Sequence, residues 1–216
     1  MALITDFDSL KAAVAQYGWR TGDTEFEDAV DGMIQMAGAR LNRKLTLRVM
    51  EEDGELTGTP GSRTIALPAD YVEPFGLSLT TSGHSQPLRY YVSGKLPQYD
   101  AQGTPNAWSI DGSGISLNCL CDQAHTFQFR YRKSFVLSEA VPTNWLLTNH
   151  PDIYLAAVCL WGGVFMRDQE EASKHKSILE EGLEELQWLE SRDVALAPLS
   201  VDAALLGGSG FNIITG

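Results

Sequence analysis

One stretch without any charged side chain, from Ile153 to Met166, constrains the fold of this chain more than any other feature. A membrane-spanning helix needs about 18 or more apolar residues, so this stretch is too short to cross a bilayer. A helix that is apolar on all sides is instead buried inside protein. Pro151 suits the first turn of such a helix, and Asp152 places a negative charge at the positive end of the helix dipole. We therefore expect a buried helix that begins at Pro151.

A second, longer helix is expected to pack against this one. Asp168, with Glu171 three residues later, has the pattern of a capping box. Gly162 and Gly163 each weaken the buried helix by about 1 kcal/mol relative to alanine, which favours close approach of another helix backbone there. Apolar residues and one glycine then recur at helical spacing, namely Ile178, Leu179, Gly182, Leu183, Leu186 and Leu189. The pattern predicts an antiparallel pair with one buried and one acidic, half-exposed helix.

Two helices are also expected near the start of the sequence. Thr5 or Asp6 can cap the first, which ends near Gly18. Asp23 or Thr24 can begin the second, whose apolar face consists of Phe26, Val30, Met33, Ala37, Leu41 and Leu45. The cations that close this helix, Arg40, Arg43 and Lys44, suit the negative end of its dipole, and we interpret them as helix-end electrostatics and solvation.

Between the two helical regions the chain is rich in Gly, Pro, Ser and Thr, with short alternating runs that predict strands. The clearest hairpin is WSIDGSGISLN, with Asp111-Gly112 at its turn. The clearest strand is His125–Arg132, in which Phe127, Phe129 and Tyr131 point to one side. The other candidate strands are Arg48–Glu52, Glu55–Thr59, Thr64–Leu67, Phe75–Thr81 and Gln86–Val92.

Together these patterns predict an α+β fold, a bundle of about four helices with an inserted small antiparallel β-domain and an extended C-terminal tail. The expected divisions are helices in 1–45, a β-rich insertion in 46–141, the C-terminal helical pair in 142–193 and the tail in 194–216.

Signatures of catalysis and of cofactor or metal binding are missing from the sequence. His84, His125, His150 and His175 are scattered without metal-ligand spacing, and Cys119-x-Cys121 has no partner ligands. The glutamates Glu180, Glu181, Glu184 and Glu185 could supply a carboxylate pair, but beside a leucine stripe they are typical of a solvated helix face. We therefore predict no enzyme, no cofactor and no metal.

Charge and cysteine content limit the partners and the compartment. A formal net charge of −12 opposes tight non-specific binding to nucleic acid, which relies on Lys and Arg. Three cysteines cannot all pair, which favours a reducing compartment. The opening MALITDFDSLKAAV lacks the features of a signal peptide, so we expect a soluble protein made in the cytoplasm, without contact to a membrane.

The last residues form an apolar segment behind a glycine hinge, Gly207 to Gly210. Two interpretations stay open: a frayed or self-docked tail, or an arm donated to a neighbour. In the second case the contact residues are Leu205, Leu206, Phe211, Ile213 and Ile214.

The chain resembles the head–tail adaptor (connector) proteins of tailed bacteriophages along nearly its whole length. The resemblance is carried by the opening ITDFDSLKAAVAQY, by a second helix ending AGARLNRKL, and by the segment TIALPADYVEPFGL. Its most specific part is the block PTNWLLTNHPDIYLAAVCLWGGVFMRD.

The resemblance implies a virion structural protein in the head–tail neck, assembled in the host cytoplasm. Its copies would form a homo-oligomeric ring, dodecameric in that family, which docks under the portal protein, extends the DNA channel and offers a platform to a downstream tail or neck protein. DNA would pass without specific binding. Glu180, Glu181, Glu184 and Glu185 would then line the channel or form an inter-subunit acidic face.

Three alternatives remain at this point. The chain could be another neck component, such as a stopper or tail terminator. It could also be a ligand- or glycan-binding module that uses Tyr90, Tyr91, Tyr99 and Trp108 of the β-insert, or a hydrolase whose site the sequence does not reveal.

Overall fold

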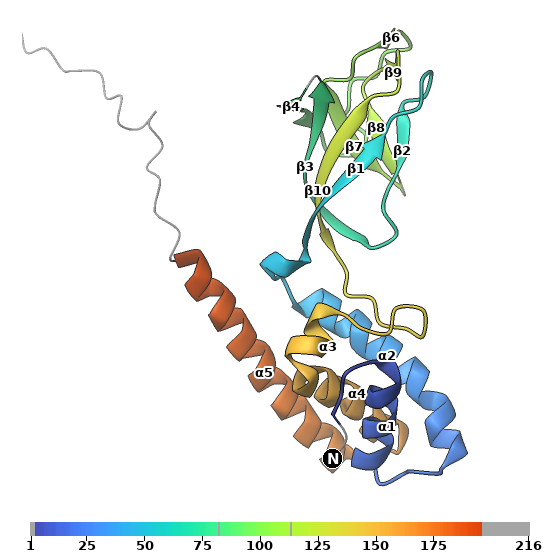
Figure 1. The fold of residues 1–216 in the computed structure, drawn as a ribbon, viewed down its shortest axis with the longest axis vertical. Coiled ribbons are helices and arrows are strands. Elements are labelled where there is room, and N and C mark those ends of the chain that lie inside the picture. Colours follow the sequence, from blue (N-terminus) through green and yellow to red (C-terminus); the bar gives the residue numbers. More distant parts are fainter. Residues whose placement is uncertain (1–2, 82, 113, 196–216) are drawn as a thin grey trace, which may run out of the picture.

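The computed structural model describes residues 3–81, 83–112 and 114–195, and over these residues the fold is α+β, as the sequence predicts. Helices gather at one end of an elongated molecule and the strands at the other, with the last helix running diagonally along the helical end (Figure 1). The helices are α1 (Phe7–Tyr17), α2 (Thr24–Lys44), α3 (Trp145–Asn149), α4 (Pro151–Phe165) and α5 (Gln169–Ala195), and a short 3-10 turn, η1 (Arg48–Met50), follows α2.

The helix starts follow the capping signals. Asp6 caps α1 with a full capping box, in which its carboxylate accepts the Ser9 backbone N–H at 2.9 Å. Asp23 caps α2. At α5, the Asp168 carboxylate accepts the backbone N–H groups of Glu170 and Glu171, both at 3.1 Å. The side chain of Glu171 instead accepts a hydrogen bond from Lys174 Nζ at 2.9 Å. Of the predicted capping box, the structure therefore shows the bonds to the Asp168 carboxylate.

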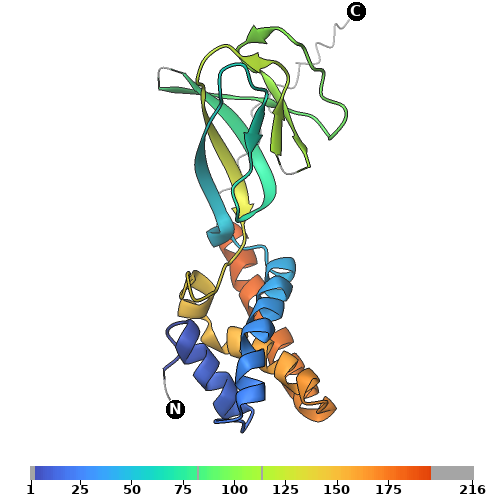
Figure 2. The same cartoon turned by 90° about the vertical axis from the view of Figure 1, so that its right-hand side faces the viewer.

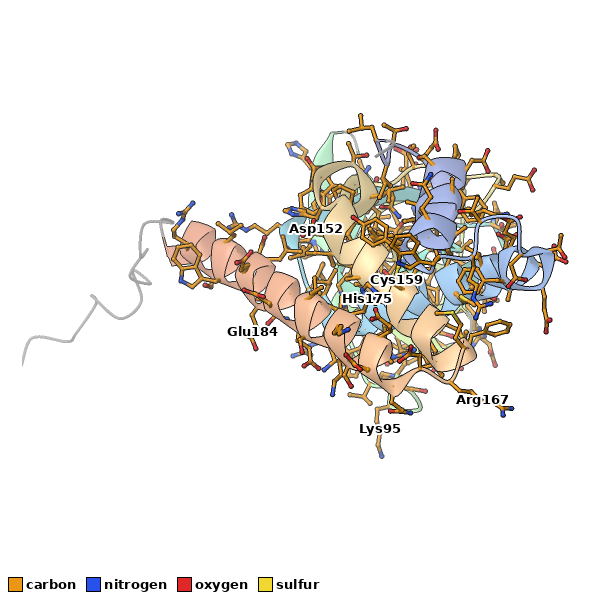
Figure 3. All side chains as sticks on the ribbon, turned by 90° about the horizontal axis from the view of Figure 1, so that it is seen from below. Lys95, Asp152, Cys159, Arg167, His175 and Glu184 are labelled. Atoms are coloured by element: carbon orange, nitrogen blue, oxygen red, sulfur yellow. The ribbon has the colours of Figure 1, made fainter. Side chains whose placement is uncertain are left out.

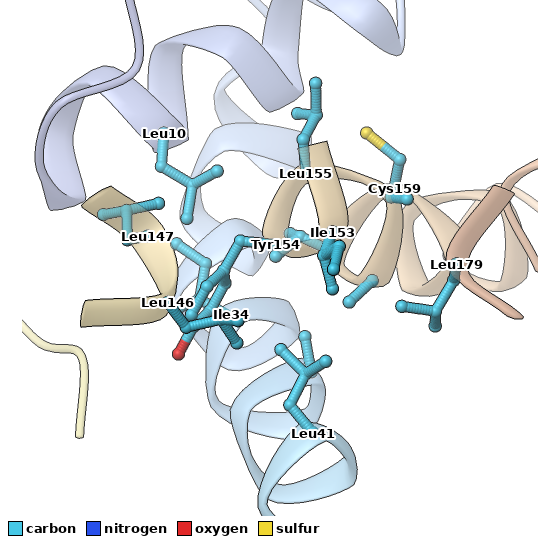
Figure 4. Close-up of a cluster of buried hydrophobic side chains, with 14 of the residues drawn as sticks. Leu10, Ile34, Leu41, Leu146, Leu147, Ile153, Tyr154, Leu155, Cys159 and Leu179 are labelled. Atoms are coloured by element: carbon cyan, nitrogen blue, oxygen red, sulfur yellow. The ribbon is translucent and has the colours of Figure 1, made fainter. Parts of the chain in front are cut away.

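The helical core is built around α4, as the uncharged stretch predicts. Close to α4, the side chains of Leu10, Ile34, Leu41, Leu146 and Leu179 converge from four other helices (Figure 4). Tyr154 is fully buried in this cluster, and its hydroxyl accepts a hydrogen bond from Asn144 Nδ2 at 3.3 Å. That asparagine also caps α3, a one-turn helix within a segment that the sequence suggests is only a lead-in.

The paired glycines of α4 have the packing role expected of them. A Cβ on Gly163 would lie 2.7 Å from the backbone nitrogen of Ala172, so the backbone of α5 passes directly over this position. A Cβ on Gly162 would instead meet the Phe26 ring at 3.5 Å. The antiparallel α4–α5 pair therefore depends on Gly163 for its closest approach.

The strands form two four-stranded sheets and one two-stranded sheet, in the orders β1-β10-β3-β4, β2-β8-β7-β5 and β6-β9. Their bounds are β1 (Glu51–Thr57), β2 (Thr64–Ala66), β3 (Tyr71–Thr81), β4 (His84–Pro87), β5 (Arg89–Tyr90), β6 (Gln102–Gly103), β7 (Ala107–Asp111), β8 (Gly114–Leu117), β9 (Leu120–Cys121) and β10 (Thr126–Lys133). The pairings are antiparallel apart from the short β5–β7 and β6–β9 contacts, which are parallel.

The β-region encloses a hydrophobic cluster of its own between its sheets. Phe127, Phe129 and Tyr131 of β10 are buried on one side, as the alternation predicts. The β7–β8 hairpin brings in Trp108, and Asp111 lies opposite Gly114 at its end. Gly112 follows with φ 62°, a left-handed conformation that favours glycine.

Several strand predictions were wrong in their limits. The range Arg48–Glu52 is a strand only at its end: residues 48–50 form η1, and β1 begins at Glu51. Leu47 and Met50 are buried in the helical cluster and hold the chain against it. The range Glu55–Thr59 covers the end of β1, which stops at Thr57. The range Gln86–Val92 contains the end of β4 and all of β5, which belong to different sheets.

The chain crosses between the helical and β-regions twice, and side-chain hydrogen bonds join the crossings. Asn42 donates to the Phe135 carbonyl at 3.0 Å and accepts the Phe135 N–H at 2.8 Å. Arg132 donates to the Leu45 carbonyl at 3.0 Å. The Glu190 carboxylate of α5 accepts the Arg48 N–H at 2.9 Å, so the end of α5 also reaches the crossing. When the molecule is turned, α2 lies in front of the bundle and α5 behind it (Figure 2).

Candidate interaction surfaces

The four glutamates predicted as a functional group lie on the exposed side of α5. The buried side of this helix consists of Ala172, Leu179, Leu183 and Leu186, while Glu180, Glu181, Glu184 and Glu185 are all exposed. Glu184, for example, extends away from the bundle (Figure 3). Among the described residues, the ion pair given for this group joins Glu180 to Lys176 Nζ at 3.8 Å.

Helical spacing places these glutamates on two neighbouring rows. Glu181 and Glu185 are flanked by exposed apolar side chains, Ile178 and Trp188, at positions i, i+3, i+7 and i+10. We call these four residues the α5 outer stripe. Glu180 and Glu184 instead share a face with Ser177, Gln187 and Ser191, which are all polar and exposed.

The apolar members of the α5 outer stripe are far more exposed than the leucine repeat suggests. Ile178 is 52% exposed and Trp188 is 61% exposed, and the Arg192 guanidinium lies 5.3 Å from the centre of the Trp188 ring. Ile178 and Leu189 were predicted to belong to the buried repeat, and that prediction was wrong, because Leu179, Leu183 and Leu186 occupy the side facing α4 and the α2 end. Trp188 lies outside the leucine repeat, and an exposed tryptophan is a frequent anchor of protein interfaces.

A second surface follows the outer side of α2. Met36, Arg40 and Arg43 lie at i, i+4 and i+7, and we call them the α2 outer stripe. Met36 is 44% exposed. Neither arginine takes part in an ion pair within the described part of the chain, although acidic residues outnumber basic ones by 28 to 16 in the sequence.

A cavity of about 440 Å³ lies where the α1–α2 corner meets the α4–α5 corner. Trp19, which is 94% exposed and has φ 54°, lines it from one corner, and Asp168 lines it from the other. Burial, with the nearby Glu171 carboxylate, raises the pKa of the Cys159 thiol in its wall to about 12. Burial likewise lowers the pKa of His175, outweighing the opposing effect of Glu171. The thiol is therefore protonated and the imidazole favours its neutral form, an environment that does not activate the thiol as a nucleophile.

The aromatic residues considered for ligand stacking differ in their burial. Trp108 is buried and donates its indole N–H to the Leu88 carbonyl at 3.3 Å, so it belongs to the β-core. Tyr90 packs edge-on against the Trp108 ring at 4.9 Å and keeps its other side exposed. Tyr99 is exposed in the loop before β6, where its backbone N–H bonds to the Asn118 carbonyl.

The predicted contact residues of the tail lie outside the part of the chain that the structure describes. They are Leu205, Leu206, Phe211, Ile213 and Ile214. Over residues 3–81, 83–112 and 114–195, no group of three or more His, Cys, Asp or Glu side chains is placed to hold a metal ion. Within the same ranges, no helix combines the length and the apolar character that a membrane crossing requires.

Comparison with protein families gives a match that covers most of the chain. A family model described as the SU10 adaptor protein matches residues 5–202, which include the helical bundle and all three sheets. No curated protein matches the chain.

Proposed function

The chain belongs to the SU10 adaptor protein family, a family of phage head–tail adaptors, and from this premise we propose that its copies form a ring that docks under the portal. The family is one of structural adaptors, which indicates a non-enzymatic role in the neck of the virion. The observation that carries the proposal is the family match over residues 5–202, because it includes both the helical and the β-regions rather than one shared element.

The proposed ring is a dodecamer that extends the DNA channel and presents a platform for a downstream tail or neck protein. Its subunits associate in the host cytoplasm and remain in the virion neck. A closed ring needs two different surfaces on each subunit that meet when one copy is rotated onto the next. The elongated subunit supports this proposal, because α2 and α5 flank opposite sides of α4 (Figures 1 and 2).

We assign the β-rich insertion, residues 46–141, to a unit carried by the helices 1–45 and 142–193. Its separate hydrophobic cluster supports this division. We assign residues 194–216 to an arm that reaches the portal or a neighbour. Leu205, Leu206, Phe211, Ile213 and Ile214 would supply its apolar contacts, since alternating apolar side chains suit strand addition to a partner.

Glu180 and Glu184 are the better candidates to face passing DNA. Their row on α5 continues through Ser177, Gln187 and Ser191, which are polar and exposed, so this row can stay hydrated in the assembled ring. A carboxylate surface repels phosphate groups and lets DNA slide without adhering to the wall.

The proposal is tested by mixing the chain with its portal protein and measuring the mass of the complex by native mass spectrometry. We expect one portal with a closed ring of this chain, and the subunit count tests the dodecamer. Electron microscopy of the same complex should show an extended channel. A full-length chain that never joins the portal would contradict the proposal.

The tail is tested separately with a chain that lacks residues 207–216. We expect weaker attachment to the portal with unchanged circular dichroism and melting temperature, because the deleted residues follow the described helices. Unchanged attachment would remove the tail, but not the ring, from the proposed function.

A further inference from the structure

We propose that the α5 outer stripe of one copy docks on the α2 outer stripe of a second copy of this chain. This inference rests on the proposed ring and names the surfaces that close it. The two stripes lie on different helices, α2 and α5, whose ends meet where Gln187 bonds to the Lys44 carbonyl. A contact between the α5 outer stripe of one copy and the α2 outer stripe of the next joins two different surfaces, and copies joined in this way associate head to tail, as a ring requires.

Charge complementarity identifies the second copy as the occupant. The α5 outer stripe presents Glu181 and Glu185, and the α2 outer stripe presents Arg40 and Arg43. Arg40 is half-buried and the other three side chains are exposed. None of the four has an ion-pair partner within the described residues, although other charged side chains of the chain do, such as Lys11 with Asp31 at 2.7 Å. Each stripe therefore offers the charge that the other lacks.

The spacing of the charges along the two helices is also compatible. At a rise of about 1.5 Å per residue, Glu181 and Glu185 lie about 6 Å apart along α5, and Arg40 and Arg43 about 4.5 Å apart along α2. Two packed helices can thus bring both pairs together at one crossing. Arginine suits this role because its planar guanidinium binds a carboxylate through two N–H groups.

Apolar side chains at the ends of the stripes give the contact an interior. Trp188 and Ile178 flank the two glutamates, and Met36 lies one turn before Arg40. Tryptophan is typical of interface anchors, and a flexible methionine adapts to the surface that it meets. Burial of these side chains supplies affinity, while the charge pairs fix the register.

Charge reversal on either stripe tests the contact. We expect Glu181→Lys with Glu185→Lys, and separately Arg40→Glu with Arg43→Glu, to raise the concentration for half-assembly on the portal by about tenfold or more, because like charges then face each other. The matched control is Glu180→Lys with Glu184→Lys, which makes the same charge change on the polar face of α5. Its assembly should stay close to that of the wild-type chain.

The decisive arm mixes the two defective variants in equal amounts. Alternating copies then juxtapose opposite charges at every contact, with lysines facing glutamates at one contact and the original glutamates and arginines at the next. We expect the mixture to recover assembly, since an alternating ring closes when the number of copies is even. Rescue between chains cannot come from refolding of either variant, and melting temperatures close to the wild type confirm that both are folded.

The possible results distinguish the proposed ring from the proposed contact between the stripes. Wild-type copies that form no ring on the portal overturn the proposed function and this inference together. A wild-type ring with unaffected stripe variants, with an equally impaired polar-face control, or without rescue in the mixture overturns the inference alone. Loss only with the arginine variant would assign the α2 outer stripe to the portal and likewise overturn it.

Discussion

The closest contact in the bundle allows a prediction with opposite signs at two neighbouring residues. In Gly163→Ala, the new Cβ would lie 2.7 Å from the Ala172 nitrogen and 3.0 Å from its Cα, closer than side chains pack against a backbone. In Gly162→Ala, the nearest atom is Phe26 Cζ at 3.5 Å, an ordinary contact distance. Both substitutions add the same methyl group to α4, so their difference isolates the approach of α5.

The expected magnitude follows from two opposing terms. Alanine gains about 1 kcal/mol over glycine within a helix. Overpacking costs about 1–3 kcal/mol, and a rigid backbone neighbour belongs near the upper limit. Gly163→Ala should therefore reduce the free energy of unfolding by about 1–2 kcal/mol. Gly162→Ala should raise it by up to about 1 kcal/mol, because its methyl group finds space against the Phe26 ring.

Thermal unfolding followed by circular dichroism at 222 nm measures this difference. In a chain of this size, about 1 kcal/mol corresponds to a change of about 2–4 °C in melting temperature. We expect Gly163→Ala to melt at a lower temperature than the wild type, and Gly162→Ala at the same or a higher temperature. If Gly163→Ala melted at or above the wild-type temperature, α5 would not pass as close to α4 as described, and the reasoning would be refuted.

Three further predictions concern caps and buried thiols. Asp168→Ala removes the acceptor of two N–H groups in the first turn of α5, so urea unfolding should show a free energy of unfolding lower by about 1 kcal/mol. Asp168→Asn should keep most of the wild-type stability, because asparagine also caps helices. Hydrogen bonds from the Ser9 backbone N–H, and then from its hydroxyl, lower the pKa of Asp6, so its stabilising contribution is present above about pH 4 and is lost as the pH falls through the lowered value. Wild type should be more stable than Asp6→Asn at pH 7, and their unfolding free energies should converge in acid; a constant difference would contradict the assignment. The three cysteines are buried and each thiol pKa is raised, chiefly by burial, so alkylation at pH 8 should be slow in the native chain and fast in urea.

The helices could be predicted well because their signals are local. The Asp6 cap and the uncharged stretch after Pro151 each act within one or two helical turns, and both lie where expected. The strand limits could not be predicted equally well. Arg48 to Met50 has a strand-like composition, but burial of Met50 among distant helical residues makes it a 3-10 turn. Tertiary packing decides such segments, and a single sequence does not contain it in readable form.

The candidate surfaces could likewise be predicted only where local spacing determines them. That the glutamates of α5 are exposed follows from their spacing beside the leucines. The spacing also places Trp188 one helical turn from Glu184 and Glu185, on the exposed side of α5. The exposure of Ile178 could not be predicted from the sequence, because Ile178 continues the apolar repeat. The structure shows that Leu179 is buried instead and that Ile178 is exposed. Exposed apolar residues within such a repeat can therefore be recognised only from the structure.

The position of α5 connects the proposed contact between copies with the orientation of the β-region. The two hydrophobic clusters are separate, so hydrogen bonds at the crossings carry much of the connection between them, including both bonds of the Asn42 amide with Phe135. Two hydrogen bonds of α5 also reach the crossings. The Glu190 carboxylate accepts the Arg48 N–H, and Gln187 Nε2 donates to the Lys44 carbonyl at 3.3 Å. Both residues lie within two positions of Trp188, the apolar anchor of the α5 outer stripe. A copy that packs on Trp188, as we propose, therefore contacts the same helical turn whose side chains bond to the crossing.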